Sequence, residues 1–182
     1  MEATGECDGD WKSLLHGNDI AGWEPDDPRV WSRDGDALVI DAAGLNQCNA
    51  LTYQRGNWSN FELSVQATLV HGANLQIDFA ITAERPRVYM LDWLRGMGKM
   101  AISSYERGKH GTNVLQLLDM DIEWGREYDL LLAVEGSTVK SFVDRQPVSD
   151  VDVNDDLTGT ISLGTYGPHA IARFRDPRIR AG

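Results

Sequence analysis

The chain has 182 residues, 42% of them hydrophobic, and an excess of acidic over basic side chains gives it a net charge of −11 at pH 7. This length and apolar content are sufficient for one sizeable core. A nucleic acid is excluded as the expected partner, because an acidic chain without a basic cluster repels a polyanion. Membrane insertion is also excluded, since no apolar run approaches the roughly 20 residues that cross a bilayer.

The N-terminal residues 1–10 are mostly small or acidic, and they predict a loose tail in front of a single domain over 11–182. The start MEATGECDGDW has no basic segment followed by an apolar one, so it lacks the pattern of an export signal. The chain has two cysteines, Cys7 and Cys48. They could form a disulfide in an oxidising compartment or remain as two free thiols, and the count is compatible with both.

Turn residues divide the first part of the chain into short segments. Trp11, Leu14 and Leu15 form a small apolar patch before the first of these turns. The dipeptide Asp34-Gly35 favours a tight hairpin, because both residues tolerate positive φ. The strands predicted in this part are 30–33, 37–41 and 49–54.

The longest alternation of apolar and polar residues contains two predicted strands, 61–69 and 75–81. Residues 71–74 supply a turn between them, so we expect the two strands to pair as a hairpin. The apolar face of such a hairpin packs against a second sheet. The polar side chains on the other face, from Glu62 to Asp92, are expected to form one shallow basin that can hold a sugar.

The rest of the chain continues in short strands, and no segment has the period of a long amphipathic helix. Short strands at spacings of about 8–12 residues are typical of an all-β sandwich. Their number favours a jelly roll of two packed antiparallel sheets. These later strands are predicted at 87–93, 99–106, 113–119, 128–134, 138–144, 148–153, 160–166 and 170–179. The expected core residues are Phe61, Leu63, Val65, Ile77, Phe79, Leu130, Leu132, Phe142, Ile161 and Phe174.

Segments spread over nearly the whole chain are similar to one known family. WKSLLHGNDIAGWE resembles the family's opening sLfnGkdlsGW, VWSRDGDALVID its W.v.dG.l hairpin, and LTYQRGNWSNFELSVQATL its L.t.....nFeL..ef.l strand. VKSFVDRQPVSDV resembles v.vwlNGqlv.d, and GTISLGTYGPHAIARFRDPRIR resembles the closing G.IgLq.hg..v.FrnirI. These patterns are those of the 3-keto-disaccharide hydrolase domains, a bacterial family of concanavalin A-like jelly rolls formerly catalogued as a domain of unknown function.

The resemblance implies a carbohydrate-active protein, a hydrolase or lyase that acts on 3-keto-disaccharides or related glycosides, and a periplasmic or extracellular location. Two segments depart from the family pattern: nSGi..R is ANLQIDFAI here, and YEvQilD is VYMLDWLRG. Only Tyr89 and Asp92 can be placed on the second motif. Since VYMLDWLRG also resembles strands of lectin-like and laminin G-like sandwiches, a non-catalytic carbohydrate-binding module is the alternative. A structural or adhesion domain is a third possibility.

Three acidic residues are the candidates for catalysis. Asp78, Asp92 and Glu106 lie on neighbouring predicted strands or at their ends. Cleavage of a glycosidic bond commonly uses two carboxyl groups about 5–9 Å apart. In a 3-keto sugar the carbonyl group acidifies the neighbouring C–H, so a single base could begin an elimination. The alternative is that all three are solvated acids of an acidic protein.

Aromatic and polar residues near the same strands are the candidates for sugar binding. Trp93 is the first of them, because it stands beside Asp92 and Arg95 and so combines a ring, an acceptor and a donor. The alternative for the aromatic residues is a structural role in core packing. The full set of expected substrate-binding residues is Gln76, Tyr89, Trp93, Arg95, Tyr105 and Trp124.

The histidines are not spaced as metal ligands, so neither a metal nor another cofactor is expected. Asp150, Asp152, Asn154 and Asp156 alternate as in a calcium loop, but Asp155 and Ile161 occupy the positions where an EF-hand has glycine and glutamate. An acidic turn is therefore the expectation there, with calcium as the alternative. The sequence contains no signal for an oligomeric state.

Overall fold

The computed structural model of the protein describes residues 10–45 and 47–182. All of the predicted tail except its last residue lies outside these residues, and so does Cys7. The structure therefore does not test the tail or a Cys7–Cys48 disulfide. No helix in the described part of the chain has the length and apolarity needed to cross a bilayer. The elements are β1 (Lys12–Ser13), β2 (Trp23–Pro25), β3 (Trp31–Asp34), β4 (Ala37–Asp41), β5 (Asn49–Tyr53), β6 (Phe61–His71), β7 (Asn74–Ile81), β8 (Arg87–Leu94), the 3-10 helix η1 (Arg95–Met97), β9 (Lys99–Glu106), β10 (Asn113–Asp119), β11 (Glu127–Glu135), β12 (Thr138–Val143), β13 (Gln146–Asp152), β14 (Thr160–Thr165) and β15 (Ile171–Ala181).

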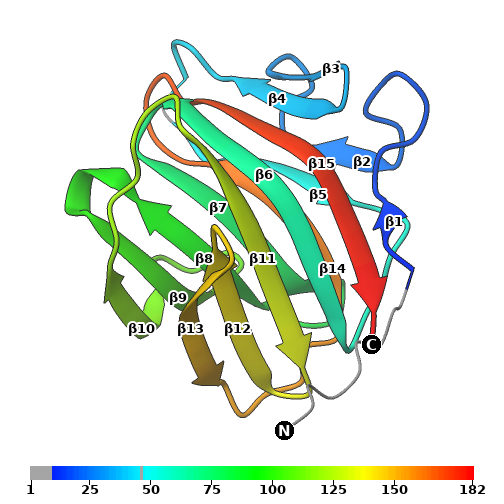
Figure 1. The fold of residues 1–182 in the computed structure, drawn as a ribbon, viewed down its shortest axis with the longest axis vertical. Helices are drawn as coiled ribbons and strands as arrows, with labels where there is room; N and C mark the ends of the chain where they lie inside the picture. The colour runs from blue at the N-terminus through cyan, green and yellow to red at the C-terminus, as the bar shows by residue number, and fades with distance from the viewer. Residues whose placement is uncertain (1–9, 46) are drawn as a thin grey trace, which may run out of the picture.

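The strands form two packed sheets (Figure 1). The first sheet has the order β13-β12-β11-β6-β15-β4-β3, with β1 paired to β15, and the second has the order β10-β9-β8-β7-β14-β5-β2. Neighbouring strands in both sheets run antiparallel. The predicted all-β sandwich of two antiparallel sheets is confirmed.

The hairpin predicted between 61–69 and 75–81 is wrong. β6 pairs with β11 and β15 in the first sheet, whereas β7 pairs with β8 and β14 in the second. The turn between the two strands crosses from one sheet to the other, and their apolar faces meet in the core. Alternation shows which residues of a strand face inward but not which strand lies beside it. The expected single basin from Glu62 to Asp92 is therefore divided between two opposite outer surfaces.

The crossing between the sheets requires glycine at position 72. Gly72 has a φ of +122°, and a Cβ atom at this position would lie 3.0 Å from the Cα of Ala170. We expect Gly72→Ala to lower the free energy of unfolding by about 1–3 kcal/mol, because the substitution adds both backbone strain and a backbone clash. Gly108→Ala is the matched control, since Gly108 also has a positive φ but open space around it. Urea unfolding that gives equal losses for the two variants would contradict the close approach.

The hairpin predicted across Asp34-Gly35 is confirmed, and the same sheet contains a second local hairpin. β3 pairs with β4 across Gly35, and β11 pairs with β12 across Gly136, each with the glycine at positive φ. Short turns set these pairings directly, so the sequence pattern was sufficient to predict them.

The core lies between the two sheets and contains nine of the ten residues expected there. Phe142 is the exception, because Ser141 and Val143 on either side of it face inward and leave its ring on the outer surface of the first sheet. Since neighbouring residues of a strand face opposite sides, Phe142 and its inward neighbours cannot share one face. Phe174, by contrast, is fully buried and stacks against Trp31.

Candidate functional site

Polar side chains gather on the outer face of the second sheet. β7 places its apolar residues in the core and turns the alternate residues Asn74, Gln76 and Asp78 outward, and β8 turns Asp92 to the same side. Although they face away from the core, these side chains are nearly enclosed: Asp78 is 4% exposed and Asp92 is 9% exposed. Enclosure of two carboxyl groups is costly, so this face has the character of a site and not of a solvated surface.

A cavity of about 490 Å³ lies over this face. Amide, hydroxyl and carboxyl groups line it together with a few apolar side chains, which is the usual composition of a small-molecule site. Its lining residues are Cys48, Ala73, Asn74, Gln76, Met90, Asp92, Leu94, Tyr105, Gly111, Thr112 and Tyr166.

Asp78 lies beneath the cavity wall and is held by hydrogen bonds. Gln76 Nε2 donates to Asp78 Oδ1 at 2.7 Å, Tyr105 Oη donates to Asp78 Oδ2 at 3.0 Å, and Ser162 Oγ is 3.5 Å from the same oxygen. Burial raises the pKa of Asp78 to about 6 and outweighs the opposite effect of these donors, and the negative charge of Asp92 adds to the rise. The hydrogen bonds to Asp78 thus fix two cavity-lining residues, Gln76 and Tyr105.

Asp92 borders the cavity directly. Its Oδ1 accepts a hydrogen bond from Asn74 Nδ2 at 2.6 Å, while its Oδ2 has no hydrogen-bond partner among the described residues. Asn74 Oδ1 in turn accepts from the backbone N–H of Tyr166 at 2.5 Å, which fixes the orientation of the amide. Burial raises the pKa of Asp92 to about 6, against the lowering effect of Asn74. At neutral pH, Asp92 is a mostly ionised carboxylate with one oxygen available to a ligand.

The two carboxyl groups are diagonal neighbours across adjacent strands. Asp78 is opposite Met90 in the register of β7 and β8, and Asp92 is opposite Gln76. Diagonal positions of this kind are about 7–8 Å apart in a sheet. One sugar ring could therefore contact Asp92 and the side chains that Asp78 holds at the same time.

Two further groups at the cavity stay protonated. Burial, and then the negative charge of Asp78, raises the pKa of Tyr105, so its hydroxyl group is a hydrogen-bond donor. Cys48 is an exposed residue, yet desolvation of its thiol beside the cavity, and then the negative charge of Asp78, raise the pKa of that thiol. Cys48 is therefore a neutral thiol at physiological pH and not a nucleophile.

Because both carboxyl groups are buried, we expect the protein to be more stable at pH 5 than at pH 7. Asp78 and Asp92 have a folded-state pKa of about 6 against an ordinary value of 3.8. The stability that their protonation contributes is complete below pH 3.8 and is lost as the pH rises through 6. Between pH 5 and pH 7 the difference is about 1 kcal/mol for each group. Denaturant unfolding at several pH values measures it, and a stability that falls from pH 7 to pH 5 would contradict the enclosure of the pair.

Two expected ligand contacts lie in the core instead. Trp93 is 2% exposed, donates its indole N–H to the backbone oxygen of Met120 at 2.9 Å and packs edge-on against Tyr128. Tyr89 stacks on Phe79 in the core, and its hydroxyl group donates to Asp155 at 2.7 Å. The inward residues of β8 are those that alternate with Asp92, so neither ring reaches the cavity.

Glu106 is separated from the other two candidate acids. It lies at the end of β9, where its carboxylate forms ion pairs with Lys109 and, at 3.7 Å, with Arg87. The hydrogen bond and charge of Lys109 lower the pKa of Glu106. Of the three acids predicted from the sequence, the structure brings together Asp78 and Asp92 only.

Of the expected binding residues, Gln76 and Tyr105 line the cavity. Arg95 and Trp124 are not among its lining residues but contact each other, with the Arg95 guanidinium carbon 3.8 Å from the centre of a Trp124 ring. Sequence reasoning missed Asn74 and Tyr166, and it missed Ser162. Alternation places Asn74 on the outer face of its strand, but nothing in the pattern shows that β14, with Ser162 and the following Tyr166, lies beside β7.

Among residues 10–45 and 47–182, no group of three or more His, Cys, Asp or Glu side chains could hold a metal ion. In the segment that resembles a calcium loop, Asp155 accepts the hydroxyl of Tyr89, and Asp156 accepts the backbone N–H of Thr158. These carboxylates have protein partners and do not converge on a common centre.

Comparison with known proteins gave a family and several similar folds. Residues 10–180 match the 3-keto-alpha-glucoside-1,2-lyase-like domain family. The carbohydrate binding module CBM66 from Bacillus subtilis has a TM-score of 0.75 and 16% identity over 88% of this chain and 96% of that chain. A Bacillus licheniformis beta-glucanase has a TM-score of 0.68 and 10% identity over 96% of this chain and 98% of that chain. A Bacillus subtilis protein of unknown function with a galectin-like fold has a TM-score of 0.69 and 10% identity over 93% of this chain and 97% of that chain. At these identities the solved structures show the fold, a concanavalin A-like jelly roll. A comparison with curated protein sequences gave no match.

Proposed function

Since this chain belongs to the 3-keto-alpha-glucoside-1,2-lyase-like domain family, we propose that its cavity binds a 3-keto-glucoside and cleaves the glycosidic bond by elimination. The observation that supports this proposal is the pair of enclosed carboxyl groups, Asp78 and Asp92, with raised pKa values in a cavity lined by amide and hydroxyl groups. Groups of this kind, poised between charged and neutral forms near physiological pH, are characteristic of acid and base catalysis.

The chemistry needs one base. The carbonyl group at C3 of the sugar acidifies the proton on C2. A base removes that proton, the electron pair forms a double bond between C1 and C2, and the bond from C1 to the glycosidic oxygen breaks. The leaving alkoxide takes up a proton to become an alcohol. Addition of water to the C1–C2 double bond would complete a net hydrolysis.

Asp92 is the base in this proposal. Its Oδ2 has no partner in the part of the chain that the structure describes, and Asp92 borders the cavity, whereas Asp78 lies behind Gln76 and Tyr105. Gln76 donates one Nε2–H to Asp78 and retains a second one for the carbonyl oxygen at C3. Asp78 acts as a positioning residue, because its hydrogen bonds orient Gln76 and Tyr105.

A non-catalytic carbohydrate-binding module is the second candidate. The observation in its favour is that no Arg, Lys or His side chain is among the described residues that line the cavity, so these residues offer no charged donor for developing negative charge on the carbonyl oxygen. Such a module would bind the sugar through the same amide and hydroxyl groups and leave it intact.

Incubation with 3-keto-trehalose and 3-keto-glucosides separates the two candidates. The proposal expects release of free sugar above a boiled control, together with a product that absorbs as an unsaturated ketone. Calorimetric binding of the same glycosides without any release would favour the binding module. If the protein neither binds these glycosides nor releases sugar from them, both candidate functions are overturned.

A further inference from the structure

Arg95 is next to the cavity lining through its backbone. It begins η1 directly after Leu94, which lines the cavity, and its backbone N–H donates to the oxygen of Ala73, another lining residue, at 2.8 Å. Arg95 follows Asp92 by three positions, or about 10 Å along an extended strand. A group bound by Arg95 would thus belong to the unit next to the sugar that contacts Asp92.

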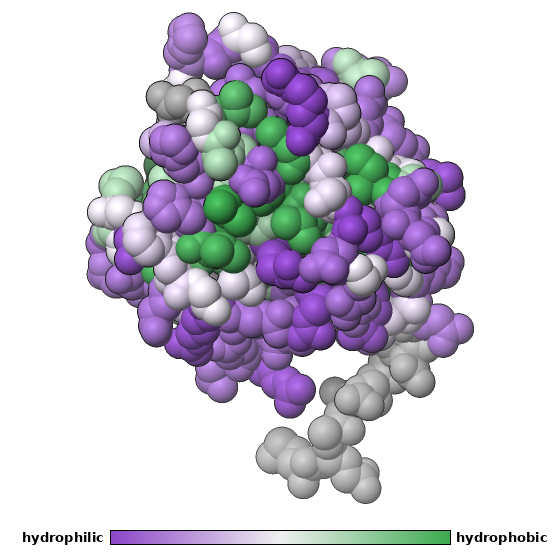
Figure 2. Space-filling model, turned by 90° about the horizontal axis from the view of Figure 1, so that it is seen from above, coloured by the Kyte–Doolittle hydropathy of each residue, from purple (hydrophilic) through white to green (hydrophobic). Residues whose placement is uncertain are grey.

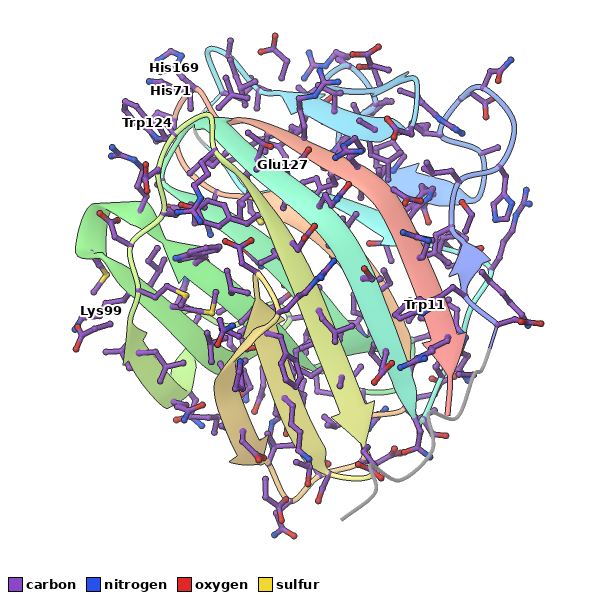
Figure 3. The ribbon with its side chains drawn as sticks, in the orientation of Figure 1. Trp11, His71, Lys99, Trp124, Glu127 and His169 are labelled. Atoms are coloured by element: carbon purple, nitrogen blue, oxygen red, sulfur yellow. The ribbon has the colours of Figure 1, made fainter. Side chains whose placement is uncertain are left out.

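The guanidinium group of Arg95 is held flat against an aromatic ring. Its central carbon lies 3.8 Å from the centre of a Trp124 ring. Trp124 is itself fixed, because its indole N–H donates to the oxygen of Gly72 at 3.2 Å and its ring stacks with His71 at 4.8 Å between centroids (Figure 3). Stacking restricts the long side chain before any ligand arrives, so a ligand would bind a preorganised fork of N–H donors.

This end of the sandwich is accessible. Trp124 is 46% exposed, Tyr166 is 56% exposed, and Val70 nearby is 42% exposed. Figure 2 looks down on this end, and apolar side chains are visible there within a mostly polar surface. A ligand that extends out of the cavity would therefore meet aromatic rings and Arg95 together.

Arg95 has no anionic partner in the described part of the chain. No carboxylate among the described residues lies within 4.0 Å of its guanidinium nitrogens, although other arginines are paired, such as Arg175 with Glu127. The Nε atom of Arg95 is buried and has no hydrogen-bond acceptor among the described residues. Burial of Nε closes that edge of the guanidinium group to a ligand, so a carboxylate would bind through the two terminal nitrogens, whose edge also matches it in a bidentate arrangement.

We infer that Arg95, stacked on Trp124, binds the carboxylate of an acidic sugar unit attached to the sugar in the cavity. The substrate class is then a 3-keto-glucoside whose leaving group carries a carboxylate, such as a uronate. The inference rests on the proposed function for the position of the reacting sugar. Binding of the acidic unit itself depends only on the cavity and its rim.

A matched pair of disaccharides tests this inference, one a glucosyl-glucose and the other the corresponding glucosyl-glucuronate. Calorimetry of the wild-type protein at pH 7 and low salt is expected to give about tenfold tighter binding of the acid, because the two ligands differ in one charge-assisted bidentate contact. Raising the salt concentration is expected to reduce the preference. Equal binding of the two disaccharides, or binding of neither, would overturn the inference.

Variants assign the preference to Arg95. Arg95→Gln is expected to abolish it, and Arg95→Lys, which keeps the charge but loses the fork, to reduce it. Arg145→Gln is the matched control, since it removes the same charge in the exposed turn between β12 and β13. A preference that survives Arg95→Gln, or that Arg145→Gln removes equally, would contradict the assignment. Circular dichroism and the thermal midpoint establish that each variant is folded.

The two proposals fail separately. An Arg95-dependent preference without turnover of 3-keto-glucosides would overturn the elimination and leave the acidic subsite. Turnover of 3-keto-glucosides without any preference for the acid would overturn the subsite alone.

Discussion

Replacement of Asp92 by asparagine is expected to lower the rate of elimination from a 3-keto-glucoside by about 100- to 10,000-fold, the range that general bases contribute. The variant keeps the shape of the side chain but loses the carboxylate whose Oδ2 no described residue contacts by a hydrogen bond. The affinity for the sugar should change little, because asparagine still offers a carbonyl oxygen to the ligand. The measurement is the release of the leaving alcohol with time, with calorimetry on an unreactive glycoside beside it.

The pH dependence of the wild-type rate gives a second readout of the same residue. The base acts in its ionised form, and its pKa is raised to about 6, so the rate should fall as the pH decreases through 6. Glu106→Gln is the control, because Glu106 is ion-paired away from the cavity and its loss should change the rate by no more than a few fold. If Glu106→Gln lowered the rate strongly and Asp92→Asn did not, the base would be Glu106 and not Asp92.

Replacement of Trp93 by alanine is expected to lower the free energy of unfolding by about 3–5 kcal/mol, the cost of a large cavity in a packed core. Trp93 is 2% exposed and loses both its hydrogen bond to Met120 and its contact with Tyr128. Guanidinium unfolding followed by circular dichroism measures the loss.

Trp124→Ala is the comparison for this prediction, because the Trp124 ring is 46% exposed. Its cost should be about 1 kcal/mol or less, as for most exposed positions. If Trp93→Ala kept full stability and lost sugar binding, the ring would belong to the site and not to the core.

The local pattern of the sequence predicted most strands, because turn residues and alternation are local signals. The strand 99–106, for example, has the bounds of β9. The same alternation contained a signal that the sugar-binding hypothesis did not use. Asp92 and Trp93 are neighbours in one strand, and neighbours in a strand face opposite sides, so they could not both reach the cavity.

The arrangement of the strands could not be predicted in the same way. β6 and β7 are separated by a short turn, yet they lie in different sheets, while β7 and β14 are far apart in sequence and lie side by side. Periodicity has no information on such pairings, because an inward apolar face is satisfied by either sheet. The sequence could therefore place Asp78, Asp92 and Glu106 on neighbouring strands or at their ends, but it could not show which of them lie together, and it missed Ser162 and Tyr166.

A crystal structure of the Asp92→Asn variant with an intact 3-keto-glucoside tests the proposal most directly. We expect the sugar in the cavity over β7 and β8, with C2 within about 3–3.5 Å of the side chain at position 92, the distance of a reactive arrangement. The C3 oxygen should face Gln76. A sugar bound on the outer face of the first sheet, or one whose C2 points away from position 92, would contradict the account.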